Sequence, residues 1–129
     1  MGKKLKIGAD TGLEYAVKKW VNSLAPDYDD GYEGAFKDLF YGGCESGMVS
    51  DLIYYSDTVK FYKKHRREIH ELLRETMEGT GAKSPADLFG DKWERDDPMA
   101  DDTNNQNLLA WFGFEEAARI LASKAGFDY

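Results

Sequence analysis

Apolar residues recur at steps of three and four along most of this chain, which is the spacing of one buried helix face. The first such stripe runs from Leu13 to Leu24, and Pro26 is expected to stop it. Later stripes keep the same spacing. The pattern therefore predicts further helices around 35–40, 46–53 and 57–78, one starting at Ser84, and a last one over 103–122.

Residues that favour helix starts and stops stand at several of these boundaries. Thr11–Glu14 and Thr103–Gln106 both have the capping-box pattern, in which a hydroxyl and a carboxylate or amide satisfy free N–H groups at a helix start. Ser84–Asp87 combines a capping serine, a proline at the first helical position and an acid in the first turn. Gly79 and Gly81 are expected to end the long helix over 57–78.

The fold class follows from these helix signals and from the lack of strand and hairpin signals. Two-residue hairpin turns with alternating flanks do not occur, and Val and Ile are scarce outside the helical stripes. With 129 residues and 14% aromatic content, one core without disulfides or metal is expected. The sequence thus predicts a compact all-α single domain, residues 1–129, of five or six helices, with at most one short strand at Leu5–Ile7.

The last predicted helix is the most apolar segment, yet it contains Glu115, Glu116 and Arg119. At 100° per residue the apolar side chains cover most of the helix circumference, and the three charges share one narrow side. Glu115 and Arg119 have the four-residue spacing of a surface ion pair. We interpret the three charges as the solvent-facing edge of a central helix and not as a reactive carboxylate pair.

Net charge limits the classes of partner. The formal charge is −7 and the pI is near 4.8, which disfavours direct binding to nucleic acid or to anionic membranes and favours basic partners. A single cysteine, Cys44, cannot form an internal disulfide, which indicates a reducing compartment. Without an apolar run of about 18 residues, no membrane helix is expected, so the predicted location is the cytoplasm of the host cell.

Cys44 is the residue that best supports an enzymatic alternative. It precedes a predicted helix start, where the helix dipole would lower the pKa of its thiol, and His65 or His70 could act as base. A cysteine enzyme also needs an orienting group and an oxyanion hole, and the sequence locates neither. A small buried thiol at a glycine-rich corner is the preferred interpretation, so no catalytic residue is predicted.

Known metal and phosphate motifs are not matched. His65 and His70 are five residues apart, where four would place both on one helix face, and four basic neighbours would repel a cation. The segment 79–84 lacks the glycine before the lysine of a phosphate loop, and 27–31 does not fit a calcium loop. We therefore predict no metal site and no cofactor.

Charge is concentrated in three segments. Residues 27–38 hold five acids and one base, and residues 91–102 hold six acids and two bases, so each carries −4. Residues 60–74 hold six bases and two acids, which gives +4. Carboxylates steer a partner electrostatically and large rings supply binding energy, so the acidic segments are candidate interfaces. The predicted partner-binding residues are Asp27, Tyr28, Asp29, Asp30, Tyr32, Glu33, Asp91, Trp93, Glu94, Asp96, Asp97, Asp101 and Asp102.

Two stretches carry a family resemblance. The residues GCESGMV at 43–49, LIYYSDT at 52–58 and FY at 61–62, with NLLAWFGFEEA at 107–117, are similar to signatures of a family of short uncharacterised proteins from phages and mobile elements. The resemblance covers roughly residues 43–125. It implies an accessory gene of a phage or plasmid, and small acidic proteins from such sources often inhibit host defence. No catalytic role follows from it.

The sequence favours a non-catalytic protein-binding module. In this interpretation an acidic surface competes with nucleic acid for a basic partner, such as a host defence nuclease of the CRISPR or restriction type. One alternative is a thiol-dependent enzyme that uses Cys44 with a histidine. The other is a homodimeric structural or regulatory phage protein that pairs through the 57–78 helix.

Overall fold

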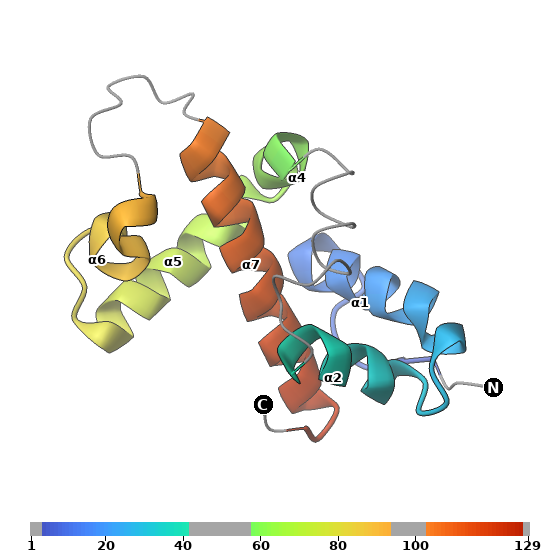
Figure 1. Ribbon diagram of the computed structural model, residues 1–129. Coiled ribbons are helices and arrows are strands. Elements are labelled where there is room, and N and C mark those ends of the chain that lie inside the picture. Colours follow the sequence, from blue (N-terminus) through green and yellow to red (C-terminus); the bar gives the residue numbers. More distant parts are fainter. Residues whose placement is uncertain (1–3, 42–57, 94–102, 128–129) are drawn as a thin grey trace.

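The computed structural model describes residues 4–41, 58–93 and 103–127, and these form an all-α fold (Figure 1). None of the described residues lies in a strand, and Leu5–Ile7 is irregular chain. This confirms the predicted fold class of five or six helices. The described α-helices are α1 (Gly12–Leu24), α2 (Tyr32–Tyr41), α4 (Thr58–Lys64), α5 (Arg66–Thr80), α6 (Pro85–Phe89) and α7 (Thr103–Lys124), with short 3-10 turns η1 (Ala25–Asp27) and η2 (Gly90–Lys92).

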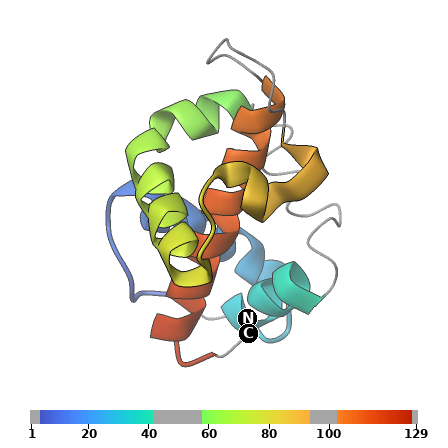
Figure 2. The same cartoon turned by 90° about the vertical axis from the view of Figure 1, so that its left-hand side faces the viewer.

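Helix α7 is the central element, and α1, α4 and α5 pack around it (Figures 1 and 2). Its sequence is apolar on most sides, which suits a helix with neighbours all round. Leu109, Ala110, Phe114 and Leu121 are buried along it. Near its start, the Thr58 hydroxyl donates to the Asn107 side chain and ties α4 to α7.

The N-terminal half adds a second layer made of α1 and α2. The predicted stripe of α1 is buried, with Val17 and Val21 fully covered, and Phe36 of α2 is covered equally. Phe36 also contacts the ring of Phe40 at 6.4 Å and the ring of Phe127 at 6.2 Å. The C-terminal turn of the chain is thereby held against α2.

The prediction of one continuous helix over 57–78 is wrong. The chain leaves helical geometry at His65, with φ −114° and ψ 19°, and α4 and α5 meet there in a bend that we call the elbow. The N–H of His65 still donates to the carbonyls of Phe61 and Tyr62, so the backbone stays bonded. Because α4 and α5 take different directions, both can pack on α7 (Figure 2). Neither glycine nor proline marks this position, so the periodicity alone did not reveal it.

The start of α1 is capped by a distant residue and not by the predicted box. Thr11 makes no side-chain cap bond. The Glu14 carboxylate accepts instead from the N–H of Ala9 and from Lys124. The N–H of Leu13 donates to both oxygens of Glu68 on α5, at 3.0 and 2.9 Å. By contrast, the helix start predicted at Ser84 is present, and Ser84 and Asp87 form a local capping box there.

The polar edge of α7 is where the sequence placed it, with one difference. Arg119 is exposed and Glu115 and Glu116 are half-buried. The ion pair joins Arg119 to Glu116 at 3.2 Å, and not to Glu115 as predicted. The guanidinium also lies 5.5 Å from the centre of the Phe40 ring.

Candidate functional sites

The first acidic segment forms an exposed turn between α1 and α2, which we call the acidic turn (residues 27–33). Asp27, Asp29 and Asp30 are exposed. Asp30 and Glu33 share Lys37, at 3.8 and 3.5 Å. Within the described residues, neither Asp27 nor Asp29 has an ion pair. The turn therefore presents two carboxylates without an ion pair and two that share one lysine.

The two tyrosines of this turn, Tyr28 and Tyr32, attach it to the hydrophobic core. Tyr28 and Tyr32 are half-buried and pack against the core, and the Tyr32 ring lies 6.0 Å from that of Phe127. Burial, together with the nearby carboxylates of Asp38 and Asp27, raises the pKa of Tyr28 to about 12. Its hydroxyl is therefore a neutral donor at physiological pH. The two rings expose only part of their surface to a partner.

The second acidic segment is only partly described. Asp91 is exposed in η2, and Trp93 stacks on Phe89 with ring centres 5.5 Å apart. Glu94, Asp96, Asp97, Asp101 and Asp102 lie outside the described residues. In Figure 1, α6, which η2 follows directly in the chain, lies on the other side of α7 from α2. The structure thus does not bring the described parts of the two acidic segments together.

Of the residues of the enzymatic alternative, the structure describes the two histidines. Cys44 lies outside the described residues. The Nε2 of His70 is 2.6 Å from the hydroxyl of Tyr62. Burial, and next the charge of Arg66, lowers the pKa of His70. Among the described residues, no group of three or more His, Cys, Asp or Glu side chains could hold a metal ion.

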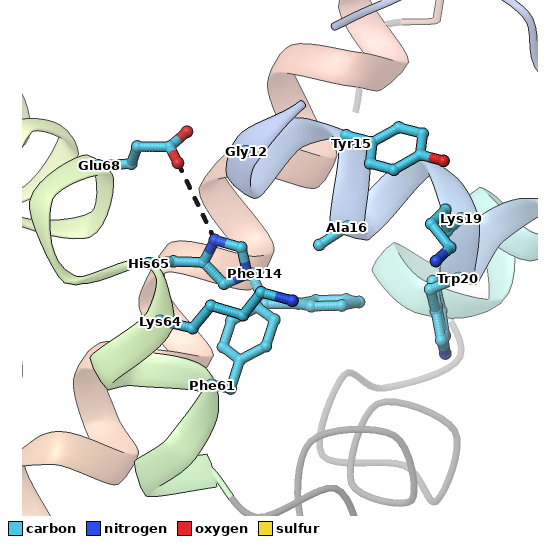
Figure 3. Close-up of a pocket in the computed structure, with 10 residues that line it drawn as sticks. All are labelled: Gly12, Tyr15, Ala16, Lys19, Trp20, Phe61, Lys64, His65, Glu68 and Phe114. Carbon is cyan, nitrogen blue, oxygen red and sulfur yellow. Dashed lines mark ion pairs between the residues drawn. The ribbon is translucent and has the colours of Figure 1, made fainter. Parts of the chain in front are cut away.

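A pocket of about 640 Å³ lies between α1 and the elbow, and the sequence did not predict it (Figure 3). Ligand sites in proteins commonly have volumes of about 300–1,000 Å³. Four rings line it, those of Tyr15, Trp20, Phe61 and Phe114. The remaining lining residues are Gly12, Ala16, Lys19, Lys64, His65 and Glu68. The sequence signal that could have indicated this pocket is lysine next to aromatic residues. It occurs at Lys19–Trp20 and where Phe61–Tyr62 precede Lys63–Lys64.

His65 and Glu68 form the polar wall of this pocket. His65 is buried, and its Nδ1 is 3.9 Å from a Glu68 oxygen. Burial lowers the pKa of His65, and this outweighs the opposite effect of Glu68, so the ring is neutral near pH 7. The charged pair at 3.9 Å therefore exists only in acid. The Glu68 carboxylate is held by the N–H of Leu13, as described above.

A second hollow, of about 430 Å³, adjoins the elbow and is basic. Its lining consists of Lys63, Lys64, Arg66, Arg67 and His70. Arg67 pairs with Glu71 at 3.6 Å. Four of the six bases of residues 60–74 therefore lie around one hollow, because the bend brings the end of α4 and the start of α5 together.

Comparison with known proteins gives a family and no function. A family model described as a domain of unknown function (DUF7222) matches residues 14–126. The chain belongs to this family. The match spans all of the helices of Figure 1 from Glu14 of α1 onward. Neither the curated proteins nor the solved structures gave a match to this DUF7222 protein. In the described part of the chain, no helix is both long enough and apolar enough to span a bilayer.

Proposed function

We propose that this DUF7222 protein is a non-catalytic binding protein that engages a basic partner through the acidic turn. The observation that carries the proposal is the exposure of Asp27, Asp29 and Asp30 on a turn whose base is fixed by packed rings. A rigid array of carboxylates attracts a basic surface and loses little conformational entropy when it binds. The half-exposed rings of Tyr28 and Tyr32 add apolar contact at the same place.

The partner is a basic protein that handles nucleic acid, such as a host defence nuclease of the CRISPR or restriction type. A net charge of −7 supports this choice, because a nucleic-acid groove presents clustered cations. The protein would act in the host cytoplasm as the product of a phage or mobile element. The resemblance of residues 43–49 and 107–117 to proteins of such origin supports that source. Glu94, Asp96, Asp97, Asp101 and Asp102 would extend the interface.

The test compares two variants that change net charge equally. The first carries Asp27→Asn, Asp29→Asn and Asp30→Asn. The control carries Gln at Glu71, Glu75 and Glu78, which are exposed acids on α5. Each variant is immobilised and exposed to bacterial lysate at low and high salt, and retained proteins are identified by mass spectrometry. Elution with duplex DNA then asks whether nucleic acid competes for the same surface.

The proposal expects a nucleic-acid-binding protein that the wild type and the control retain and the acidic-turn variant loses. Retention should fall at high salt, because surface charges are screened beyond about 10 Å at 0.1 M salt. Equal retention by the two variants refutes the role of the acidic turn. Retention that DNA cannot compete away refutes competition with nucleic acid.

The enzymatic alternative has its own test. Iodoacetamide labelling of Cys44 is measured on the folded protein near neutral pH and again in denaturant. A binding protein without a catalytic thiol is expected to react in the folded state no faster than free cysteine. Labelling well above that rate would favour the thiol enzyme and would count against the present proposal.

A further inference from the structure

The ring-lined pocket and the basic hollow are neighbours, because Lys64 belongs to the lining of both. Lys64 therefore lies between the four rings of the pocket and four further cationic or imidazole side chains of the elbow. In Figure 3, Lys64 extends from α4 toward α1. The two hollows adjoin at this shared lysine, and we call them together the joint site, which has an aromatic part and a basic part.

The aromatic part suits a flat ring. Trp20 and Phe114 meet edge to face at 5.1 Å and form one wall, and Phe61 lies 6.2 Å from Phe114. Tyr15 on α1 has Lys19 at 5.6 Å from its ring centre. Aromatic side chains bind planar heterocycles by stacking, without regard to the identity of the heterocycle. Ala16, which is small and half-buried, leaves the room for such a ring.

The basic part suits a phosphate group. Lys63, Lys64, Arg66 and Arg67 crowd around the elbow in a protein whose net charge is −7. Within the described residues, Lys63, Lys64 and Arg66 have no ion pair with a carboxylate. Uncompensated cations this close together repel one another, and a phosphate would relieve that repulsion with charge-assisted hydrogen bonds. Arginine adds paired donors that match phosphate oxygens.

The two carboxylates that face this site, Glu68 and Glu71, cancel only part of its positive charge. Glu68 turns both oxygens to the N–H of Leu13 at the start of α1. Glu71 is occupied by Arg67. His65 is buried and His70 is exposed. Partial removal of water around each ring lowers its pKa, so both rings are neutral near pH 7. The local charge near neutral pH is therefore set by the lysines and arginines.

We infer that the joint site binds a nucleotide, with its base against the partly exposed rings of Tyr15 and Phe61 and its phosphates on the elbow. This site is separate from the acidic turn, so it goes beyond the proposed function. In Figure 1 the elbow lies between α4 and α5, away from α2. The nucleotide is a ligand of a binding protein here, and no reaction on it is implied.

Calorimetric titration tests the inference with three probes: ATP, adenosine and inorganic triphosphate. ATP should bind with a dissociation constant below about 1 mM, which is weak but measurable. Adenosine lacks the phosphates and triphosphate lacks the ring, so each should bind at least about tenfold more weakly than ATP. Triphosphate that equals ATP in affinity would mean a site for phosphate alone and would overturn the inference.

Variants assign the two halves of the site, with folding checked by circular dichroism. Ala16→Phe fills the ring pocket, and Lys64→Gln with Arg66→Gln removes two elbow charges. Each should weaken ATP binding at least about tenfold. The control is Lys4→Gln with Lys6→Gln, two exposed lysines outside both hollows, and it should leave ATP binding unchanged.

Two outcomes would overturn the inference in different ways. If the Lys64→Gln, Arg66→Gln variant and the Lys4→Gln, Lys6→Gln control weakened ATP binding equally, the affinity for ATP would depend on net charge only. A single-stranded ten-nucleotide DNA that binds at least about tenfold more tightly than ATP, and depends on the same residues, would assign the site to a nucleic-acid strand. The acidic-turn variant should bind ATP as the wild type does, so failure here is distinguishable from failure of the proposed function.

Discussion

Substituting Gly113 by alanine tests how closely α5 crosses α7. Gly113 is buried in the middle of α7. A Cβ atom there would lie 2.5 Å from Cγ1 and 3.0 Å from Cδ1 of Ile69. Ordinary contact between carbon atoms is about 3.5–4.0 Å, so the first pair would overlap by about 1 Å. Ile69 is fully buried and cannot move its side chain away.

The expected magnitude comes from two opposing effects. Alanine in a helix interior is more favourable than glycine by about 1 kcal/mol. Overpacking a filled core costs about 1–3 kcal/mol, and an overlap this large belongs near the upper end. Gly113→Ala should therefore lower the free energy of unfolding by about 2 kcal/mol.

Urea unfolding followed by circular dichroism measures this, with Gly79→Ala as control. Gly79 lies near the end of α5, and a Cβ atom there would have nothing within 4 Å. The control should be neutral or stabilising by up to about 1 kcal/mol. Ile69→Ala alone should cost about 2–5 kcal/mol, and clearly less when Gly113→Ala is present because the overlap is then gone. The close crossing would be refuted if the Gly113→Ala protein were as stable as the wild type. It would also be refuted if the losses of unfolding free energy from Gly113→Ala and Ile69→Ala simply added in the double variant.

Three further predictions concern stability and use the same urea assay. Glu68→Ala removes the cap on the Leu13 N–H and should cost about 1–2 kcal/mol, whereas Glu68→Gln, which keeps one acceptor oxygen, should cost less. Burial lowers the pKa of His65 in the folded state, so the unfolding free energy should fall as the pH drops below the unfolded value of 6.5. His65→Gln should flatten that slope, and an unchanged slope would contradict the assigned burial. Lys124→Met breaks a half-exposed pair with Glu14 at 2.8 Å, so it should cost less than about 1 kcal/mol, and less still in high salt.

Local signals in the sequence predicted most of the helices. The stripe from Leu13 to Leu24 became α1 because its periodicity fixes which face is buried, whatever the partner helix is. The helix start at Ser84 formed as predicted, because the hydrogen bonds that cap it join residues only three apart. The apolar circumference of α7 indicated a central helix, and the fold confirms it. Each of these features depends on residues within a few turns of one another.

Features that join distant segments were not predicted. The cap on α1 comes from Glu68, 55 positions further along the chain, so the pattern around Thr11 could not reveal it. The bend at His65 forms because α4 and α5 both gain contact with α7, and nothing in the local sequence marks it. The ring-lined pocket combines Trp20, Phe61 and Phe114 from three helices. The basic hollow beside this pocket was not predicted either. The sequence showed its lysines and arginines only as a run of positive charge on one continuous predicted helix.

The sequence by itself determined the all-α class, the face that each helix buries and the location of charge along the chain, because helical period and local capping act over a few residues. Only the tertiary structure decided which charges share a surface. It separates the acidic turn from Asp91 and gathers the bases of 63–67 beside the rings of α1 and α7. The physical reason is that packing on α7 selects the directions of the helices, and those directions minimise exposed apolar area without regard to the order of the charges in the chain.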